Sequence, residues 1–142
     1  MTDGQYHIEL VSGIPVVTVP EEIDVTNAAD LRAALLKAGV NGSGTLVADM
    51  TQTQFCDSSG VHALVAAHRR AQAEGGQLLL VISSAAVLRI LAITGIDRVI
   101  PNFTSVADAL AHATAHADNG QAHTASNLVS NPDADPGRAP VA

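Results

Sequence analysis

The chain has 142 residues, 47% of them hydrophobic and 15% charged, a length that fits one domain able to bury roughly two-thirds of its unfolded surface. Seven Lys and Arg against 14 Asp and Glu give a formal charge of -7, which argues against a nucleic-acid groove lined by clustered cations. A single cysteine excludes an internal disulfide framework and a Cys-rich zinc site.

The start of the chain and its apolar runs do not predict a targeting or membrane segment. Residues 1–4 lack the basic start and following apolar run of a secretory signal. The apolar run 78–82 has the length of a strand, and the next run is interrupted by Arg89, well short of the roughly 20 residues that a bilayer requires. We therefore expect a cytoplasmic protein whose cysteine stays reduced.

The composition of the chain changes near residue 117. Apolar residues recur with a clear periodicity up to residue 116, which predicts one domain over residues 1–116. Residues 117–142 are polar and contain little that could be buried, so we expect a disordered tail. A terminal peptide docked on another surface is the alternative.

The first half of the domain predicts strands around one helix. Residues 8–11 and 16–19 flank Gly13-Ile14-Pro15, which favours an antiparallel pair at a sheet edge, where proline is tolerated. Thr26 is a candidate N-cap for a helix that ends at Gly39, and residues 45–48 are typical of a strand covered on both faces. The helix would bury Leu31, Ala34, Leu35 and Ala38.

The second half alternates helices with strands. One helix begins at Val61 or just before it and runs to Gly75-Gly76, and residues 78–82 follow as a strand. Ser84 and Gly95 bound the next helix, residues 98–100 predict a strand stopped by Pro101, and Ser105-x-x-Asp108 resembles a capping box. The predicted inward residues are Val61, Leu64, Val65, His68 and Ala71, then Val87, Leu88 and Leu91, and finally Val106, Ala109, Leu110 and Ala113.

Strands that alternate with helices through short connections imply parallel, right-handed crossovers. The predicted fold class is therefore α/β: a single domain with a mixed sheet whose parallel core strands pack against about four helices.

The most informative segment is Asp57-Ser58-Ser59-Gly60, which joins a buried stretch ending in Phe55-Cys56 to a helix. Small hydroxylated residues suit such a corner because they can cap free amide groups. A hydroxyl at the positive end of a helix is also well placed to carry an anion, including a covalent phosphate. We expect Gly60 to let the backbone lie close to a docked partner, and a plain N-cap remains the alternative from spacing alone.

Several stretches in this order carry a family resemblance. They are Val47-Ala48-Asp49-Met50, Phe55-Cys56-Asp57-Ser58-Ser59-Gly60-Val61, Glu22-Ile23-Asp24 before Thr26-Asn27-Ala28, Gly75-Gly76-Gln77-Leu78-Leu79-Leu80-Val81, and Leu88-x-x-Leu91-x-x-Thr94-Gly95-Ile96. Together, over about residues 6–116, they resemble the STAS domains of anti-sigma factor antagonists. Asp-Ser-Ser-Gly alone is a weak motif, but together with the other stretches in this order it is specific.

The resemblance implies a regulatory protein without catalytic activity, cofactor or metal. Such a protein binds a cytoplasmic anti-sigma factor, usually a serine kinase of the GHKL ATPase type, and so frees a sigma factor. The resemblance also implies that the kinase phosphorylates Ser59, directly before the glycine, that the phosphorylated form no longer binds, and that a PP2C-type phosphatase restores it. The residues expected to contact the partner are Glu22, Asp24, Asp57, Ser58, Ser59, Gly60, Val61 and His62.

Two residues depart from the family pattern. Glu21 stands where a glycine often precedes the Glu-x-Asp element, so the loop before the first helix is expected to differ in shape. His62 takes the place of a small residue one turn after Ser59, either as a solvated surface side chain or as a charge-assisted contact to a phosphate. The departures bear on whether Ser59 is phosphorylated and by which kinase.

Other functions are less well supported by the sequence. A hydrolase would need Ser59, His62 and Asp57 as a triad, but the frame is not Gly-x-Ser-x-Gly, and a base three residues along the same helix points up its side. His112 and His116 share a helix face but lack the further ligands that a metal site needs.

Two further expectations concern the corner itself. Cys56 is expected to be a small core residue, and the neighbouring Asp57 disfavours the low-pKa thiolate of a redox sensor. A STAS scaffold or a small-ligand-sensing module in a signalling complex, without phosphorylation, is the alternative function within binding proteins.

Overall fold

The computed structural model describes residues 6–40 and 44–115. The chain divides into two compact units, Met1–Leu110 and Ala111–Ala142, and the sheet and the candidate site belong to the first. The predicted domain boundary after residue 116 and the predicted disordered tail, 117–142, lie outside the described residues and stay predictions.

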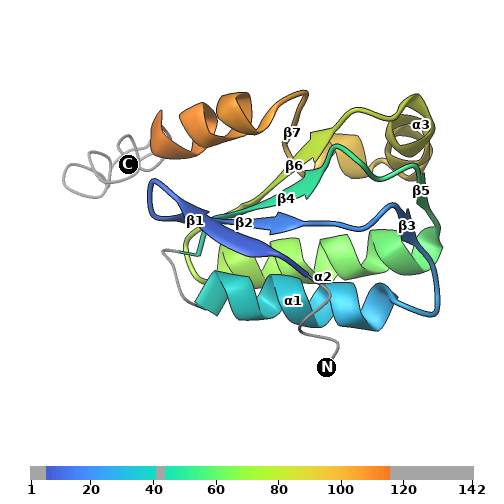
Figure 1. The fold of residues 1–142 in the computed structure, drawn as a ribbon, viewed down its shortest axis with the longest axis horizontal. Coiled ribbons are helices and arrows are strands. Elements are labelled where there is room, and N and C mark those ends of the chain that lie inside the picture. The colour runs from blue at the N-terminus through green and yellow to red at the C-terminus, as the bar shows by residue number, and fades with distance from the viewer. Residues whose placement is uncertain (1–5, 41–43, 116–142) are drawn as a thin grey trace, which may run out of the picture. The chain divides into compact units, whose positions relative to one another are not determined.

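A five-stranded mixed sheet in the order β1-β2-β4-β6-β7 forms the centre of the first unit (Figure 1). The strands are β1 (Ile8–Val11), β2 (Ile14–Thr18), β4 (Leu46–Met50), β6 (Leu78–Ile82) and β7 (Asn102–Phe103). β1 pairs with β2 antiparallel, and every other neighbouring pair is parallel. The predicted mixed sheet with parallel core strands is therefore confirmed.

The predicted antiparallel pair at the sheet edge is present, but its turn is tighter than expected. Ser12 and Gly13 have φ of 54° and 81°, so both lie in the left-handed region that a two-residue hairpin turn requires. β2 consequently begins at Ile14 and includes Pro15, which pairs with Leu10 of the edge strand. Proline has no amide proton to donate, which is tolerated next to an edge.

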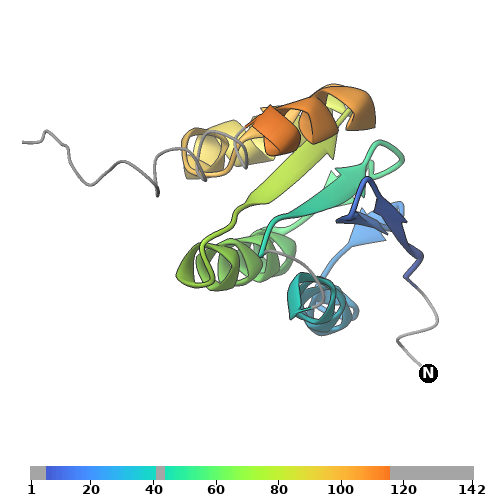
Figure 2. The ribbon, with the colours of Figure 1, turned by 90° about the vertical axis from the view of Figure 1, so that its left-hand side faces the viewer.

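Helices α1 (Ala28–Val40) and α2 (Ser58–Ala73) lie side by side on one face of the sheet (Figures 1 and 2). The prediction of a cap at Thr26 is wrong, because the Thr26 hydroxyl donates to the Asp24 carboxylate and α1 begins at Ala28. The predicted end at Gly39 is also wrong, since α1 continues to Val40. The buried face itself is as predicted, with Leu31, Ala34, Leu35 and Ala38 in the core.

The interior strand β6, between β4 and β7, is buried on both faces of the sheet. All five of its residues are buried, and Leu78, Leu80 and Ile82 belong to the core cluster that includes α1 and α2. Leu79 and Val81 alternate with them and are covered on the opposite face. In α2, Val61, Leu64, His68 and Ala71 are buried as predicted, and Val65 is half-buried.

The predicted boundaries of α3 (Ala85–Thr94) are confirmed. The Ser84 hydroxyl accepts from the Val87 amide at 3.3 Å, and Gly95 ends the helix with φ 81°, a conformation that favours glycine. Val87 and Leu91 are buried, but the prediction that Leu88 also faces the core is wrong, because its side chain is 39% exposed.

The chain after α3 differs from the predicted strand at residues 98–100. A 3-10 helix, η2 (Ile96–Arg98), stands there, and the strand β7 comes after Pro101 instead of before it. The Leu80 amide donates to the Pro101 carbonyl at 2.9 Å, which starts the pairing of β7 with β6. A fourth helix begins at residue 106, where the Ser105 hydroxyl accepts from the Asp108 amide at 3.1 Å, one half of the predicted capping box.

Candidate functional site

The corner before α2 is held by the Asp57 carboxylate. Its Oδ1 accepts from the amides of Ser59 at 2.9 Å and Gly60 at 3.1 Å, so Asp57, not a serine, is the N-cap. An acidic side chain here also interacts favourably with the positive end of the helix. The predicted start near Val61 is therefore three residues late, since α2 begins at Ser58.

Both serine hydroxyls are left free by this arrangement. Ser58 is exposed and Ser59 half-exposed, and within the described part of the chain neither hydroxyl forms a hydrogen bond. The plain N-cap interpretation of Ser59 is thus wrong, because Asp57 performs that role. A half-exposed, unbonded hydroxyl in the first turn of a helix remains available to a second molecule or to modification.

A second, two-stranded sheet brings an acidic loop to the same corner. β3 (Glu22–Ile23) pairs in parallel with β5 (Phe55–Cys56), and the Asp57 amide donates to the Ile23 carbonyl at 3.1 Å. The residue after β3 is Asp24, so it leaves its strand at the same end as Asp57 leaves β5. This pairing places the two carboxylate-bearing segments beside each other.

Asp24 has its own hydrogen-bond network. Its carboxylate accepts from the amide of Thr26 at 2.9 Å and from the Thr26 hydroxyl, and these bonds hold the pKa of Asp24 below its usual value. Its carbonyl accepts from the amides of Asn27 and Ala28, which turns the chain into α1. The loop therefore presents a fixed, negatively charged side chain beside the corner.

Gly60 faces the interior of the domain and not a docking surface. A Cβ added to it would lie 2.5 Å from the Cys56 Sγ and 2.6 Å from the Ile23 Cγ2, both closer than real contacts allow. The glycine therefore lets α2 press against β3 and β5. Val61 is 4% exposed and packs in the same core, so neither residue presents a side chain to the outside.

Cys56 is buried as expected and is not poised for redox chemistry. Burial, with a smaller contribution from the Asp57 charge, raises the pKa of its thiol to about 11. The thiol is therefore protonated at neutral pH, and it serves as a small core residue.

Two exposed apolar side chains that the sequence did not single out flank the corner. Phe55, expected to end a buried stretch, is 51% exposed, and Val25 next to Asp24 is 75% exposed. The exposure of Phe55 follows from the pairing of β5 with β3, in which its neighbour Cys56 points inward, and the two residues of β5 are too few to show that alternation in the sequence. Glu22 and His62 are exposed as well.

Ser59 lines a groove between the first halves of α1 and α2. The groove has a volume of about 350 Å³, and no sequence pattern predicts it. Polar side chains from both helices, Arg32, Ser59 and His62, face it together with the small side chains of Ala28, Ala29, Ala63 and Ala66. No short motif marks Arg32, which reaches the groove only because α1 and α2 pack together.

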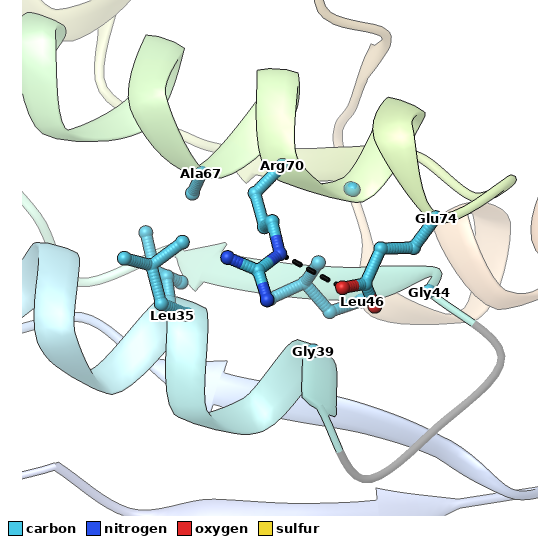
Figure 3. A pocket seen from close by; sticks show the side chains of 9 residues that line it. Leu35, Gly39, Gly44, Leu46, Ala67, Arg70 and Glu74 are labelled. Atoms are coloured by element: carbon cyan, nitrogen blue, oxygen red, sulfur yellow. Dashed lines mark hydrogen bonds and ion pairs between the residues drawn. The ribbon is translucent and has the colours of Figure 1, made fainter.

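A second pocket lies between the other halves of the same helices, where Leu35, Leu46 and Ala67 form its apolar wall (Figure 3). Arg70 donates from Nε to the Glu74 carboxylate at 2.8 Å beside it. The volume of this second pocket is about 10 Å³, which is room for roughly one water molecule. This pocket is packing space, and the Ser59 groove is the candidate site.

The enzyme and metal interpretations gain no support from the geometry. The Asp57 Oδ1 is engaged by two backbone amides, and no hydrogen bond links His62 to it in the described part of the chain. Residues 6–40 and 44–115 contain no group of three or more metal-ligating side chains, and His116 lies outside them. No described helix is long and apolar enough to cross a membrane.

The fold and the corner define a small α/β domain, and comparison with known proteins identifies its family. The family model of the STAS domain matches residues 5–109, so the chain belongs to the STAS domain family. This confirms the resemblance found in the sequence.

Solved structures show where the fold occurs. An anti-sigma factor antagonist from Mycobacterium paratuberculosis is 28% identical, with a TM-score of 0.70 over 77% of this chain and 92% of that one. SpoIIAA has the same fold in its unphosphorylated form (22% identity, TM-score 0.63, 74% and 92% covered) and, from Bacillus, in its phosphorylated form (19%, 0.58, 75% and 97%). The murine anion transporter Slc26a9 is 28% identical with a TM-score of 0.61, over 72% of this chain but 18% of that one.

Proposed function

We propose that this protein is an anti-sigma factor antagonist whose Ser59 corner binds an anti-sigma factor and thereby releases a sigma factor. The observation that carries the proposal is the half-exposed Ser59 hydroxyl, unbonded within the described residues, in the first turn of α2. The similarity to the mycobacterial antagonist over most of both chains supports it.

The proposed contact surface has an apolar part and an acidic part. Phe55 and Val25 supply exposed apolar area of the kind that dominates binding energy when a partner buries it. Gly60 and Val61 act from beneath by setting the position of α2. The predicted contact residues with outward side chains are Glu22, Asp24, Asp57, Ser58, Ser59 and His62.

Phosphorylation of Ser59 is the proposed off-switch. A serine kinase of the GHKL type transfers the γ-phosphoryl group of ATP: the Oγ–P bond forms, the bridging O–P bond of ATP breaks, and ADP and the hydroxyl proton leave. The product carries about -1.5 to -2 charges at pH 7 beside Asp57 and Asp24. The helix start accepts the anion, whereas a surface fitted to a bare hydroxyl loses affinity by repulsion and desolvation. A PP2C-type phosphatase restores the serine by hydrolysis.

The remaining features of the proposal follow from this role. The protein acts in the cytoplasm, where sigma factors work, and it has no catalytic activity and no cofactor of its own. It does not bind nucleic acid, because the seven cations of the whole chain are outnumbered two to one by carboxylates.

A STAS module that senses a small ligand is the second candidate. The groove at Ser59, which both helices line, is the place where such a ligand would bind. A small molecule bound in the groove of the protein purified from its own cells, with no co-purifying anti-sigma factor, distinguishes this function from the first.

The test is a pull-down from cell extract with Ser59→Ala and Ser59→Glu as baits. We expect Ser59→Ala to capture a kinase-type anti-sigma factor and Ser59→Glu to capture at least tenfold less. Gln72→Glu adds the same charge to an exposed position near the other end of α2 and is the matched control, which should bind like the wild type. Equal capture by both Ser59 variants refutes the switch.

A further inference from the structure

Two basic residues line the groove beside Ser59. Arg32 comes from α1 and His62 from α2, and both face the same space as Ser59. Within the described part of the chain, neither has a carboxylate or hydrogen-bond partner. In a protein with seven Lys and Arg and a formal charge of -7, an arginine that lines the same groove as a serine, without a partner in the described residues, is available to an anion.

The spacing of the residues fits a group attached to Ser59. His62 follows Ser59 by three residues on α2, which places the two side chains on one helix face, about 5 to 6 Å apart at their Cβ atoms. Arg32 lies one turn after Ala28 and Ala29 on α1, and these alanines, with Ala63 and Ala66 on α2, keep the space between the helices open. Arg32 and Ser59 therefore line the same opening from two different helices.

The chemistry of the pair suits a phosphate monoester. A guanidinium donates two parallel hydrogen bonds to phosphate oxygens, and a protonated imidazole adds a charge-assisted third. The charged groups around Ser59 are Arg32 from α1, His62 from α2, Asp57 at the cap and Asp24 on the adjoining loop. Arg32 and His62 line the groove, whereas Asp57 and Asp24 do not. A phosphate on Ser59 is therefore attracted towards the groove.

We propose that the phosphate on Ser59 is held inside its own domain, in the α1–α2 groove, by Arg32 and His62. In the phosphorylated protein, these contacts then fix the conformation of the Ser59 side chain, an intramolecular lock. The phosphate acts through this fixed position as well as through its charge. Arg32 contributes the permanent positive charge of the lock, and His62 contributes a ring nitrogen that can donate a hydrogen bond. The inference rests on the proposed phosphorylation of Ser59.

The test uses the full chain with phosphoserine incorporated at position 59 during translation, so that neither kinase nor partner is needed. The ³¹P NMR signal is followed from pH 4 to 9. Arg32→Gln is expected to raise the second pKa of the phosphoserine by about half a unit, as loss of a nearby, partly screened cation does. Arg32→Lys should give a smaller rise, because lysine keeps the positive charge at this position.

Arg69→Gln is the matched control, because it removes the same charge from an exposed position about 15 Å further along the axis of α2. If Arg32→Gln and Arg69→Gln move the phosphoserine titration equally, the intramolecular lock is refuted. Circular dichroism melting of each variant identifies unfolding, and if Arg32→Gln does not fold, the same comparison is made between Arg32→Lys and Arg69→Gln. These titrations do not require an anti-sigma factor, so they can be interpreted even if the protein captures none. A negative titration result refutes the lock, and a negative pull-down refutes the proposed function.

Discussion

Substitution of Gly60 by alanine tests how the site is built. The new Cβ would lie 2.5 Å from the Cys56 Sγ and 2.6 Å from the Ile23 Cγ2, and both of these side chains are buried. Such overpacking costs typically about 1 to 3 kcal/mol, whereas the better helix propensity of alanine returns at most about 1 kcal/mol. We therefore expect a net loss of roughly 1 to 2 kcal/mol in the free energy of unfolding.

Gly39→Ala is the matched control, because it makes the same change in α1, where the nearest atom to the new Cβ is the Leu46 Cδ2 at 3.9 Å. Without a clash, the alanine should stabilise the protein by about 0.5 to 1 kcal/mol. Urea unfolding measures the change in the free energy of unfolding for each variant. We expect a decrease for Gly60→Ala and an increase for Gly39→Ala. A Gly60→Ala protein as stable as the wild type would refute the close packing of α2 against β3 and β5.

Further expectations follow from single contacts. Asp57→Ala should cost about 0.5 to 2 kcal/mol of stability in urea unfolding, because it leaves the amides of Ser59 and Gly60 without their acceptor, whereas Asp57→Asn keeps an acceptor and most of the stability. His68 is buried, and desolvation lowers its pKa from 6.5, so the unfolded chain binds its proton more readily and stability should fall as the pH drops below about 6.5. His68→Gln should flatten that part of the stability profile, and an unchanged profile would contradict this role for His68.

The elements that were predictable from sequence are those with strong local signals. Leu78–Ile82 is a continuous apolar run of strand length, and in the structure it is an interior strand between β4 and β7. Ser84 and Gly95 bound α3 because a capping hydroxyl and a left-handed glycine act on their immediate neighbours.

The elements that were missed depend on contacts between distant segments. β3 and β5 have two residues each, too few for any periodicity, and they exist because they pair with each other. The strand expected at residues 98–100 is displaced to Asn102–Phe103, because pairing with β6 and not local propensity selects the residues of a short edge strand.

The same limit applies to the site. The motif identified Ser59 and the acidic residues beside it, but it could not show that Gly60 faces inward or that Asp57 alone caps the helix. Arg32 is 27 positions away from Ser59 in the sequence, and it enters the groove only through the packing of α1 on α2.

The most direct test of the central claim is the affinity of the captured anti-sigma factor for two forms of this protein. Isothermal titration with the unmodified chain and with the chain carrying phosphoserine at position 59 gives the two dissociation constants. We expect the phosphorylated chain to bind at least tenfold more weakly, a difference of about 1.4 kcal/mol or more. Equal dissociation constants for the two forms would contradict it.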